Sequence, residues 1–326
     1  GPDSTFSDRD KLLIDQYLMN GGHMMWLIDP LVTDLDSIRK TQQTLATTRE
    51  TGLFDWLFHH GVRLNRNMVL DAQCAPIMLG TGPMGDHRNM QMFNWYFSPV
   101  VLSEPDAHPI CANLDPLHFD FTSTLDLVNP TDDKEATVLL SSSARSILYN
   151  APVRVASAVV NLPSEHFETD NTGGYPLAVL LEGHFDSFFA LRLSKELRDS
   201  PNFAFRPETE EGKMIVVSDA DFIRNETLTT EEGIAPLPLG YDRYSKRVIY
   251  DNKEWLLNAI SYLLDDAGQI SLRSRSIAFR PLNDQSIHGS ENTWTVMAVG
   301  GPIALVVALG LLLPAWRRRR WTHSAS

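Results

Sequence analysis

The hydrophobic pattern at the two ends of the first 265 residues predicts two amphipathic helices. Apolar residues between positions 13 and 18 fall on one face of a helix that begins after Ser7, and Asp10 completes a capping-box pattern three residues further on. Glycines at positions 21 and 22 end this helix, because glycine adopts a left-handed conformation at little cost. The second helix begins at Asn252, and its apolar residues repeat at helical spacing as far as position 264.

Between these two helices, short apolar runs predict buried strands. A run without polar alternation is typical of a strand that is covered on both faces, as in a parallel sheet. Helical spacing around residues 53–60 and 185–193 predicts further helices, and residues 208–212 predict an acidic loop. Strands that alternate with helices indicate an α/β domain around a mostly parallel sheet. The predicted strands cover residues 23–30, 62–64, 68–70, 117–121, 137–140, 153–160, 177–181 and 213–217.

Residues 75–110 depart from this pattern. Prolines and glycines recur throughout the segment, and both residue types interrupt regular structure. We therefore expect an irregular insertion over 75–110 within a single α/β domain that extends from residue 1 to residue 268.

The sequence near the C-terminus predicts one transmembrane helix over residues 293–316. No charged residue occurs between positions 294 and 316, and about 20 apolar residues suffice to cross a bilayer. A buried helix of a soluble domain is rarely this long without a charge and rarely ends in an arginine run. A juxtamembrane linker over 269–292 precedes the helix, and a basic cytoplasmic tail over 317–326 follows it. The expected membrane anchors are Trp294, Trp316, Arg317, Arg318, Arg319 and Arg320.

Composition and charge narrow the classes of function. The net charge of −13, despite the arginine-rich tail, makes nucleic acid an unfavourable partner. Cys74 and Cys111 could pair in an oxidising compartment or remain as buried thiols. No secretory signal opens the sequence, so we expect the C-terminal portion of a longer protein, with its bulk outside the cytoplasm.

The strongest candidate for a polar site follows the predicted strand at 213–217. Asp219 and Asp221 lie just beyond the end of that strand, where ligands bind in open α/β sheets, and Asn225 follows shortly after. Asp29 also follows a predicted strand and could converge with them. Two neighbouring carboxylates could bind a cation or act as acid and base, but they could equally cap and turn the chain.

Other motifs point away from cofactor and metal chemistry. Residues 80–85 match Gly-x-Gly-x-x-Gly, but a proline precedes them and no amphipathic helix follows, so we expect a plain glycine-rich loop. The sequence has no Gly-x-x-x-x-Gly-Lys-Ser/Thr loop, no His-x-x-x-His or Cys-x-x-Cys spacing, and no Gly-x-Ser-x-Gly elbow. We therefore expect no cofactor, no metal and no catalytic residue.

Several sequence blocks resemble the GldG family of gliding-motility proteins. That family is similar to the auxiliary, substrate-binding subunit of ABC transporters in Bacteroidetes. The resemblance implies a three-layer, glutamine-amidotransferase-like domain that lacks the catalytic cysteine, but it supplies no established ligand residues. It also implies two partners, an ABC permease subunit and a cytoplasmic ATPase subunit. The matching blocks are residues 15–22 (DQYLMNGG), 26–29 (WLID), 176–183 (PLAVLLEG), 214–225 (MIVVSDADFIRN), 238–244 (PLGYDRY) and parts of 252–275.

Taken together, these features predict a non-enzymatic, membrane-anchored auxiliary or substrate-binding subunit of an ABC-type transporter, linked to gliding motility or export. It would lie in the bacterial inner membrane, in contact with lipid, with most of its chain in the periplasm. Two alternatives remain open on sequence grounds. One is a periplasmic hydrolase of envelope carbohydrate or peptide that uses Asp219 and Asp221. The other is a purely structural scaffold.

Overall fold

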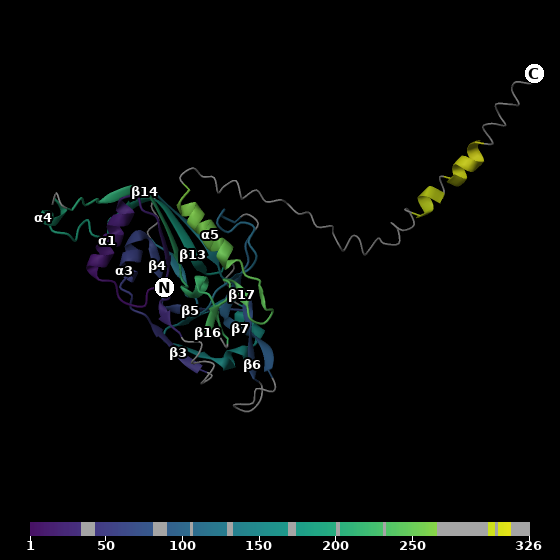
Figure 1. The fold of residues 1–326 in the computed structure, drawn as a ribbon, viewed down its shortest axis with the longest axis horizontal. Helices are drawn as coiled ribbons and strands as arrows, with labels where there is room; N and C mark the ends of the chain where they lie inside the picture. The colour runs from purple at the N-terminus through teal and green to yellow at the C-terminus, as the bar shows by residue number, and fades with distance from the viewer. Residues whose placement is uncertain are drawn as a thin grey trace, which may run out of the picture. The chain divides into compact units, whose positions relative to one another are not determined.

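The computed structural model divides the chain into two units, Gly1–Ser276 and Ile277–Ser326 (Figure 1). In the second unit the described residues are helical. The strands among the described residues all belong to the first unit. The residues that the structure describes are 1–33, 43–80, 90–104, 107–128, 133–168, 174–199, 203–230, 233–265, 299–303 and 306–313.

A four-stranded sheet lies at the centre of the first unit, in the order β1-β14-β13-β10. Its two middle strands contain the apolar runs that the sequence marks most clearly, and residues 177–181 and 214–217 of these strands are buried. β1 runs parallel to β14, with Met24 opposite Met214. The other two pairings, β14 with β13 and β13 with β10, are antiparallel. The bounds are β1 Met24–Leu27, β10 Lys134–Ser141, β13 Pro176–Asp186 and β14 Glu208–Val217.

The prediction of a mostly parallel, Rossmann-like or glutamine-amidotransferase-like sheet is therefore wrong. Among the described strands, the only parallel pairing is β1 with β14, and the remaining sheets are small and antiparallel. The reason is physical. A continuous apolar run indicates that both faces of a strand are covered, but it does not indicate whether the strand runs parallel or antiparallel to its neighbours. The remaining strands are β2 Leu31–Val32, β3 Gln43–Thr48, β4 Val62–Leu64, β5 Asn67–Asp71, β6 Cys74–Gly80, β7 Met90–Val101, β8 Leu117–His118, β9 Leu125–Leu127, β11 Ser146–Asn150, β12 Val153–Ala156, β15 Thr227–Thr230, β16 Gly233–Pro236, β17 Tyr241–Asp242 and β18 Arg247–Val248.

Helices cover both faces of the central sheet (Figure 1). On one face, Trp56 packs in a buried cluster with Met214 and Val216 of β14. On the other face, Trp255 packs in a second cluster with Ile215, the residue between them. Successive strand residues point to opposite faces, so both clusters draw on the same strand. The helices are α1 Asp8–Met19, α3 Phe54–His60, α4 Lys195–Arg198 and α5 Asn252–Leu263, and the short 3₁₀ helices are η1 Ser157–Asn161, η2 Ser164–Phe167 and η3 Asp221–Ile223.

Local helix signals in the sequence are confirmed in part. α1 begins with the predicted capping box, in which the Ser7 hydroxyl accepts from the Asp10 amide and the Asp10 carboxylate accepts from the Ser7 amide. By contrast, residues 185–193 contain the end of β13 and a turn, and the predicted acidic loop at 208–212 is the first half of β14.

The region expected to be an irregular insertion, 75–110, contains long strands. β6 and β7 form an antiparallel pair, and the register shifts between Cys74 and Pro76. A bulge is one of the few places where a strand accepts proline, so the prolines here modify the ladder and do not prevent it. Buried Trp95 and Phe97 of β7 anchor a third hydrophobic cluster beneath this hairpin.

The predicted C-terminal transmembrane helix is not found. Residues 299–303 and 306–313 are helical, but none of the helices in the described part of the chain is both long and apolar enough to span a membrane. The linker at 269–292 and the proposed anchors Trp294, Trp316 and Arg317 to Arg320 lie outside the described residues.

A buried carboxylate–imidazole pair holds α1 and α3 against the sheet. The His60 Nε2 atom lies 3.6 Å from Asp15 Oδ1, and both side chains are fully buried. The Ser187 hydroxyl and the Phe188 amide also donate to the Asp15 carboxylate. Burial works to raise the pKa of Asp15, but these hydrogen bonds and the facing His60 outweigh it and lower that pKa. Burial lowers the pKa of His60 to about 4, so His60 is neutral at pH 7.

We predict that this histidine makes the fold acid-sensitive. Its pKa is about 4 in the folded chain and near 6.5 when unfolded, so below pH 6.5 the unfolded state binds a proton that the folded state does not. Stability is then lost as the pH falls from 6.5 to 4. Urea unfolding should show that the wild type loses about 3 kcal/mol more than His60→Phe between pH 7 and pH 4. His59→Gln, at the exposed neighbouring position, should follow the wild type. Parallel curves for wild type and His60→Phe would rule out this source of acid sensitivity.

Candidate functional site

A cleft of about 130 Å³ opens beside the end of β14. Its walls come from β6, β8, η3 and the segment around β17, which are far apart in the sequence. Charged groups of both signs and tyrosine rings line it together, so the cleft offers hydrogen-bond donors, acceptors and aromatic faces to a ligand. The lining residues used below are His118, Asp120, Asp221, Arg224, Asp242, Arg243, Tyr244, Tyr250 and Asn252.

Asp219 is the buried support of this cleft. Its carboxylate accepts from the Phe222 amide at 3.1 Å and from the Asp120 amide at 2.7 Å, so it joins η3 to the segment after β8. The side chain is fully buried. Burial, and then the negative charge of nearby Asp29, raise the pKa of Asp219 well above its usual range.

Asp29 reaches the same place from β1. Its Oδ1 atom accepts from the Ala220 amide at 2.6 Å. Because β1 and β14 are parallel, their carboxyl ends meet at one edge of the sheet, which brings Asp29 and Asp219 together as the sequence suggested. Burial raises the pKa of Asp29 as well.

The other two predicted residues divide between the cleft and its surroundings. Asp221 lines the cleft, and its Oδ2 atom lies 2.8 Å from Arg224 Nη1. Burial raises the pKa of Asp221, although Arg224 works against the shift. Asn225 is not a lining residue, and its amide donates to the Leu237 carbonyl at 2.7 Å, which closes the loop around β15 and β16.

Sequence reasoning missed His118 and Asp120, which form another wall. The His118 ring stacks on Tyr250 with centroids 4.8 Å apart, and its Nε2 atom lies 3.7 Å from Asp120 Oδ1. The Ser98 hydroxyl also donates to Asp120. The signal was present, because His118 and Asp120 alternate with Leu117, Phe119 and Phe121, and alternation places both polar residues on one face of a strand.

Asn252 has a role that the helix pattern did not suggest. The N-cap position of α5 is Asp251, one residue earlier. The Asn252 side chain accepts from the His118 amide at 2.9 Å and donates to the carbonyls of His118 and Phe222 at 2.7 and 2.8 Å. A single buried amide group therefore fixes β8 and η3 relative to α5.

The segment around β17 closes the cleft. The Arg243 guanidinium pairs with Glu226 and donates to the Thr227 carbonyl at 3.2 Å. The Tyr244 hydroxyl accepts from the Met78 amide of β6 at 2.9 Å. These contacts tie two adjacent residues of the segment, Arg243 to the start of β15 and Tyr244 to β6, so the arginine and tyrosine groups are held in place before any ligand arrives.

The chemistry of the cleft suits binding. Both oxygens of the Asp219 carboxylate accept hydrogen bonds from backbone amides, so this carboxylate has a structural role. Cys74 and Cys111 are free thiols, and burial raises the pKa of each to about 12, which leaves little thiolate for nucleophilic attack. Within the described residues, the cleft brings together no set of three histidine, cysteine or carboxylate ligands for a metal.

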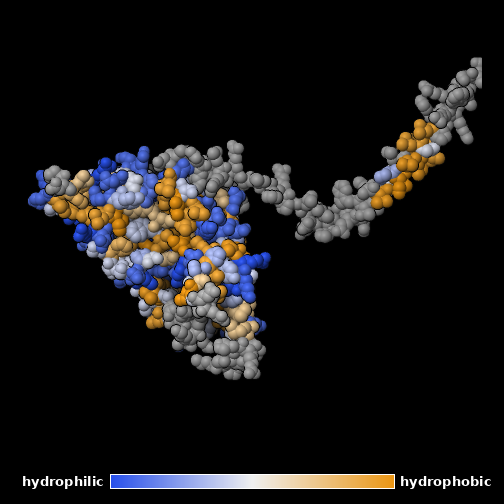
Figure 2. Space-filling view, viewed as in Figure 1, coloured by the Kyte–Doolittle hydropathy of each residue, from blue (hydrophilic) through white to orange (hydrophobic). Residues whose placement is uncertain are grey.

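A second surface lies on the open side of β1, and we call it the β1 groove. It is formed by Leu13 and Tyr17 of α1, Met25 of β1, and Ile260 and Leu264 of α5. Tyr17 and Leu264 are 57% and 73% exposed. Figure 2 shows apolar surface between α1 and α5. Exposed apolar patches of this kind mark sites where another molecule binds.

Comparison with known proteins identifies the class as a component of an ABC-type transport system. Residues 1–259 match the model of a family described as an ABC-type uncharacterized transport system. The chain belongs to this family, which confirms the coarser part of the resemblance inferred from the sequence.

Comparisons beyond the family model add little. No curated protein matches the chain. Among solved structures, an N-terminal domain described as "mmIFT52 N-terminal domain" is 13% identical, with a TM-score of 0.37, and the match covers 82% of this chain and 76% of that one.

We predict that Asp219 is structural and that Asp221 is not. Asp219→Ala leaves two buried amides without an acceptor, and it should lower the free energy of unfolding by about 3 kcal/mol. Asp221→Ala removes a partly exposed ion pair and should cost less than about 1 kcal/mol. Urea unfolding measures both variants. Equal stability of the two would contradict the assigned support role.

Proposed function

We propose that the chain is a non-catalytic auxiliary subunit of an ABC-type transport complex linked to gliding motility or export. The observation that carries this proposal is the family match over residues 1–259. The sequence resemblance to gliding-motility subunits supplies the narrower assignment. The engaged carboxylate of Asp219 and the protonated thiols favour binding over hydrolysis as the task of the cleft.

The proposed partners are a permease subunit and a cytoplasmic ATPase subunit. This sequence contains no Gly-x-x-x-x-Gly-Lys-Ser/Thr loop, and in this proposal the ATPase subunit supplies the energy of ATP hydrolysis. The cleft beside β14 would hold a polar segment of the transported molecule or of a partner, since it presents Arg224 and Arg243 together with Asp221 and Asp242.

We place this subunit at the bacterial inner membrane, with most of its chain on the periplasmic side. The support is the sequence: positions 294–316 carry no charge, and four arginines follow directly at 317–320. Apolar sequence favours contact with lipid, and basic clusters favour the cytoplasmic side.

The β1 groove is the proposed contact with the partner subunit. β1 is an edge strand, and among the described strands it pairs with β14 alone. The Ile28 amide donates to the Val217 carbonyl of β14 at 3.0 Å, so by alternation the peptide group of Met25 points to the open edge, whereas Gly1 lies beside the Leu27 carbonyl. An extended segment of a partner can pair with such an edge.

The chemistry of the groove favours a different chain as its occupant over a second copy of this one. β1 consists of Met24, Met25, Trp26 and Leu27 and lacks the lysine, proline or bulge that usually protects an edge strand. Each copy of the chain carries a net charge of −13, which opposes self-association. The expected occupant is therefore an apolar, extended segment of the permease subunit.

Charged substitutions in the groove test this proposal. The double variant Tyr17→Asp, Ile260→Asp should reduce co-purification of the permease and ATPase from solubilised membranes at least tenfold, because carboxylates would have to be buried in the contact. Both side chains are partly exposed, at 57% and 39%, so the fold should persist. Leu197→Asp on α4, at an apolar position that is 44% exposed, is the matched control and should leave recovery unchanged.

Two outcomes would contradict the proposed contact. One is undiminished recovery of both partners with the double variant. The other is a homodimer of the purified chain that the double variant abolishes, which would make the groove a contact between copies.

A further inference from the structure

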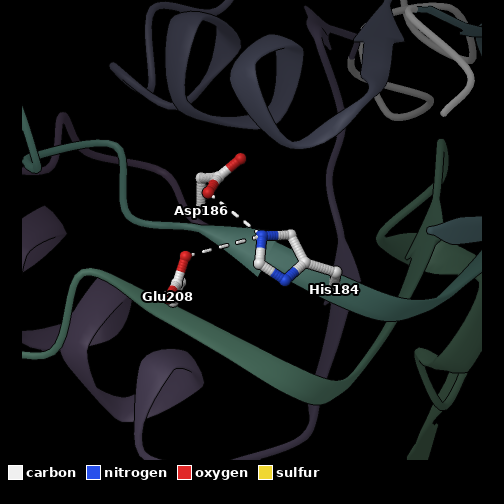
Figure 3. Close-up of side chains that lie close together, drawn as sticks. All are labelled: His184, Asp186 and Glu208. Atoms are coloured by element: carbon white, nitrogen blue, oxygen red, sulfur yellow. Dashed lines mark hydrogen bonds and ion pairs between the residues drawn. The ribbon is translucent and has the colours of Figure 1, made fainter.

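A histidine and two carboxylates lie together where β13 ends and β14 begins, away from the cleft (Figure 3). His184 and Asp186 are two residues apart on β13, and Asp186 lies directly opposite Glu208 of β14. Residues two apart on a strand, and residues opposite each other across a pair, share one face of the sheet. Asp186 and Glu208 therefore lie on the same side of the sheet. The register shifts between Gly183 and Phe185, and the distances from the His184 ring to the two carboxylates place it beside them.

The ligand atoms lie at distances that suit a small divalent ion. His184 Nε2 lies 3.1 Å from Asp186 Oδ1 and 4.0 Å from Glu208 Oε2, and the three ligand atoms are all within 4.8 Å of one another. In a tetrahedral zinc site, bonds of 2.0–2.2 Å place neighbouring ligand atoms about 3.4 Å apart. Small rotations of the two carboxylates would reach that geometry.

The second ring nitrogen of His184 supplies an independent argument. His184 Nδ1 lies 3.5 Å from Glu210 Oε2, on the opposite side of the ring from the other two carboxylates. Histidine ligands of metals characteristically donate their other ring nitrogen to a carboxylate, which fixes the ring and directs the free nitrogen at the metal. Glu210 is placed to act on His184 in this way.

The charge pattern also favours a cation. Asp186 and Glu208 form a cross-strand pair of like charges, an arrangement that destabilises a sheet unless something neutralises it. The two carboxylates are 66% and 58% exposed, so an ion could enter from solvent and keep water as a further ligand.

We propose that His184, Asp186 and Glu208 form a binding site for a divalent transition-metal ion, with Glu210 positioning the histidine. One imidazole nitrogen with two carboxylate oxygens suits zinc better than calcium or magnesium, which prefer oxygen ligands alone. No metal signal is visible in the sequence, because the ligands of this site lie on two strands and lack a helical His-x-x-x-His spacing. The proposed site does not depend on the transport function.

Zinc titration of the full chain tests the proposal. Isothermal calorimetry with zinc chloride at pH 7 should show one ion per chain. His184→Ala, Asp186→Asn and Glu208→Gln should each weaken that binding at least tenfold. Glu211→Gln is the matched control, because this exposed carboxylate lies on β14 next to Glu210 but on the other face of the strand, and it should bind zinc as the wild type does.

Cobalt supplies a second readout that distinguishes coordination from loose surface binding. Cobalt(II) bound by the wild type should show visible absorption bands that disappear in His184→Ala and persist in Glu211→Gln. Either of two results would overturn the site: no saturable zinc binding by the wild type, or equal zinc affinity in wild type and His184→Ala. In either case His184 would be the centre of an ion-pair cluster.

Discussion

The burial of one carboxylate, Asp219, determines how this fold presents its cleft. β14 leaves the sheet at a point where both of its faces are covered, so the chain beyond it has to satisfy its backbone groups within the protein. The Asp219 carboxylate does this by accepting hydrogen bonds from the amides of Phe222 and Asp120. The Asp29 carboxylate accepts a hydrogen bond from the amide of Ala220, the residue after Asp219. These bonds offset the cost of burying two neighbouring acids, and they place Asp221 and Asp120 on the cleft walls.

The sequence predicted the parts of this arrangement that depend on local chemistry. The capping box at Ser7, the apolar strand that ends at Val217 and the meeting of Asp29 with Asp219 all follow from short patterns. Strand direction did not follow, because an apolar run is the same in either direction. The long strands at 75–110 were missed because proline was taken as a stop, whereas Pro76 lies beside a register shift.

Long-range polar contacts were beyond the reach of sequence patterns. Asn252 looks like a helix cap, yet its amide binds the backbone of His118, which is 134 residues away. Asp186 and Glu208 lie in segments that the patterns assigned to a helix and a loop, and their proximity depends on the register of β13 with β14. Such contacts depend on which strands pair, and a single sequence does not encode that pairing in any local period.

Two surfaces of the chain differ in their chemistry: the cleft is charged and suits a polar ligand, and the β1 groove is apolar and suits a partner chain. Both fit an auxiliary subunit that binds and positions, while another chain hydrolyses ATP. The most direct measurement is the ATPase rate of the reconstituted permease and ATPase subunits, with and without this chain. The account predicts that the chain hydrolyses no ATP alone and changes the rate of its partners at least twofold. An unchanged rate, with no binding to either subunit, would contradict it.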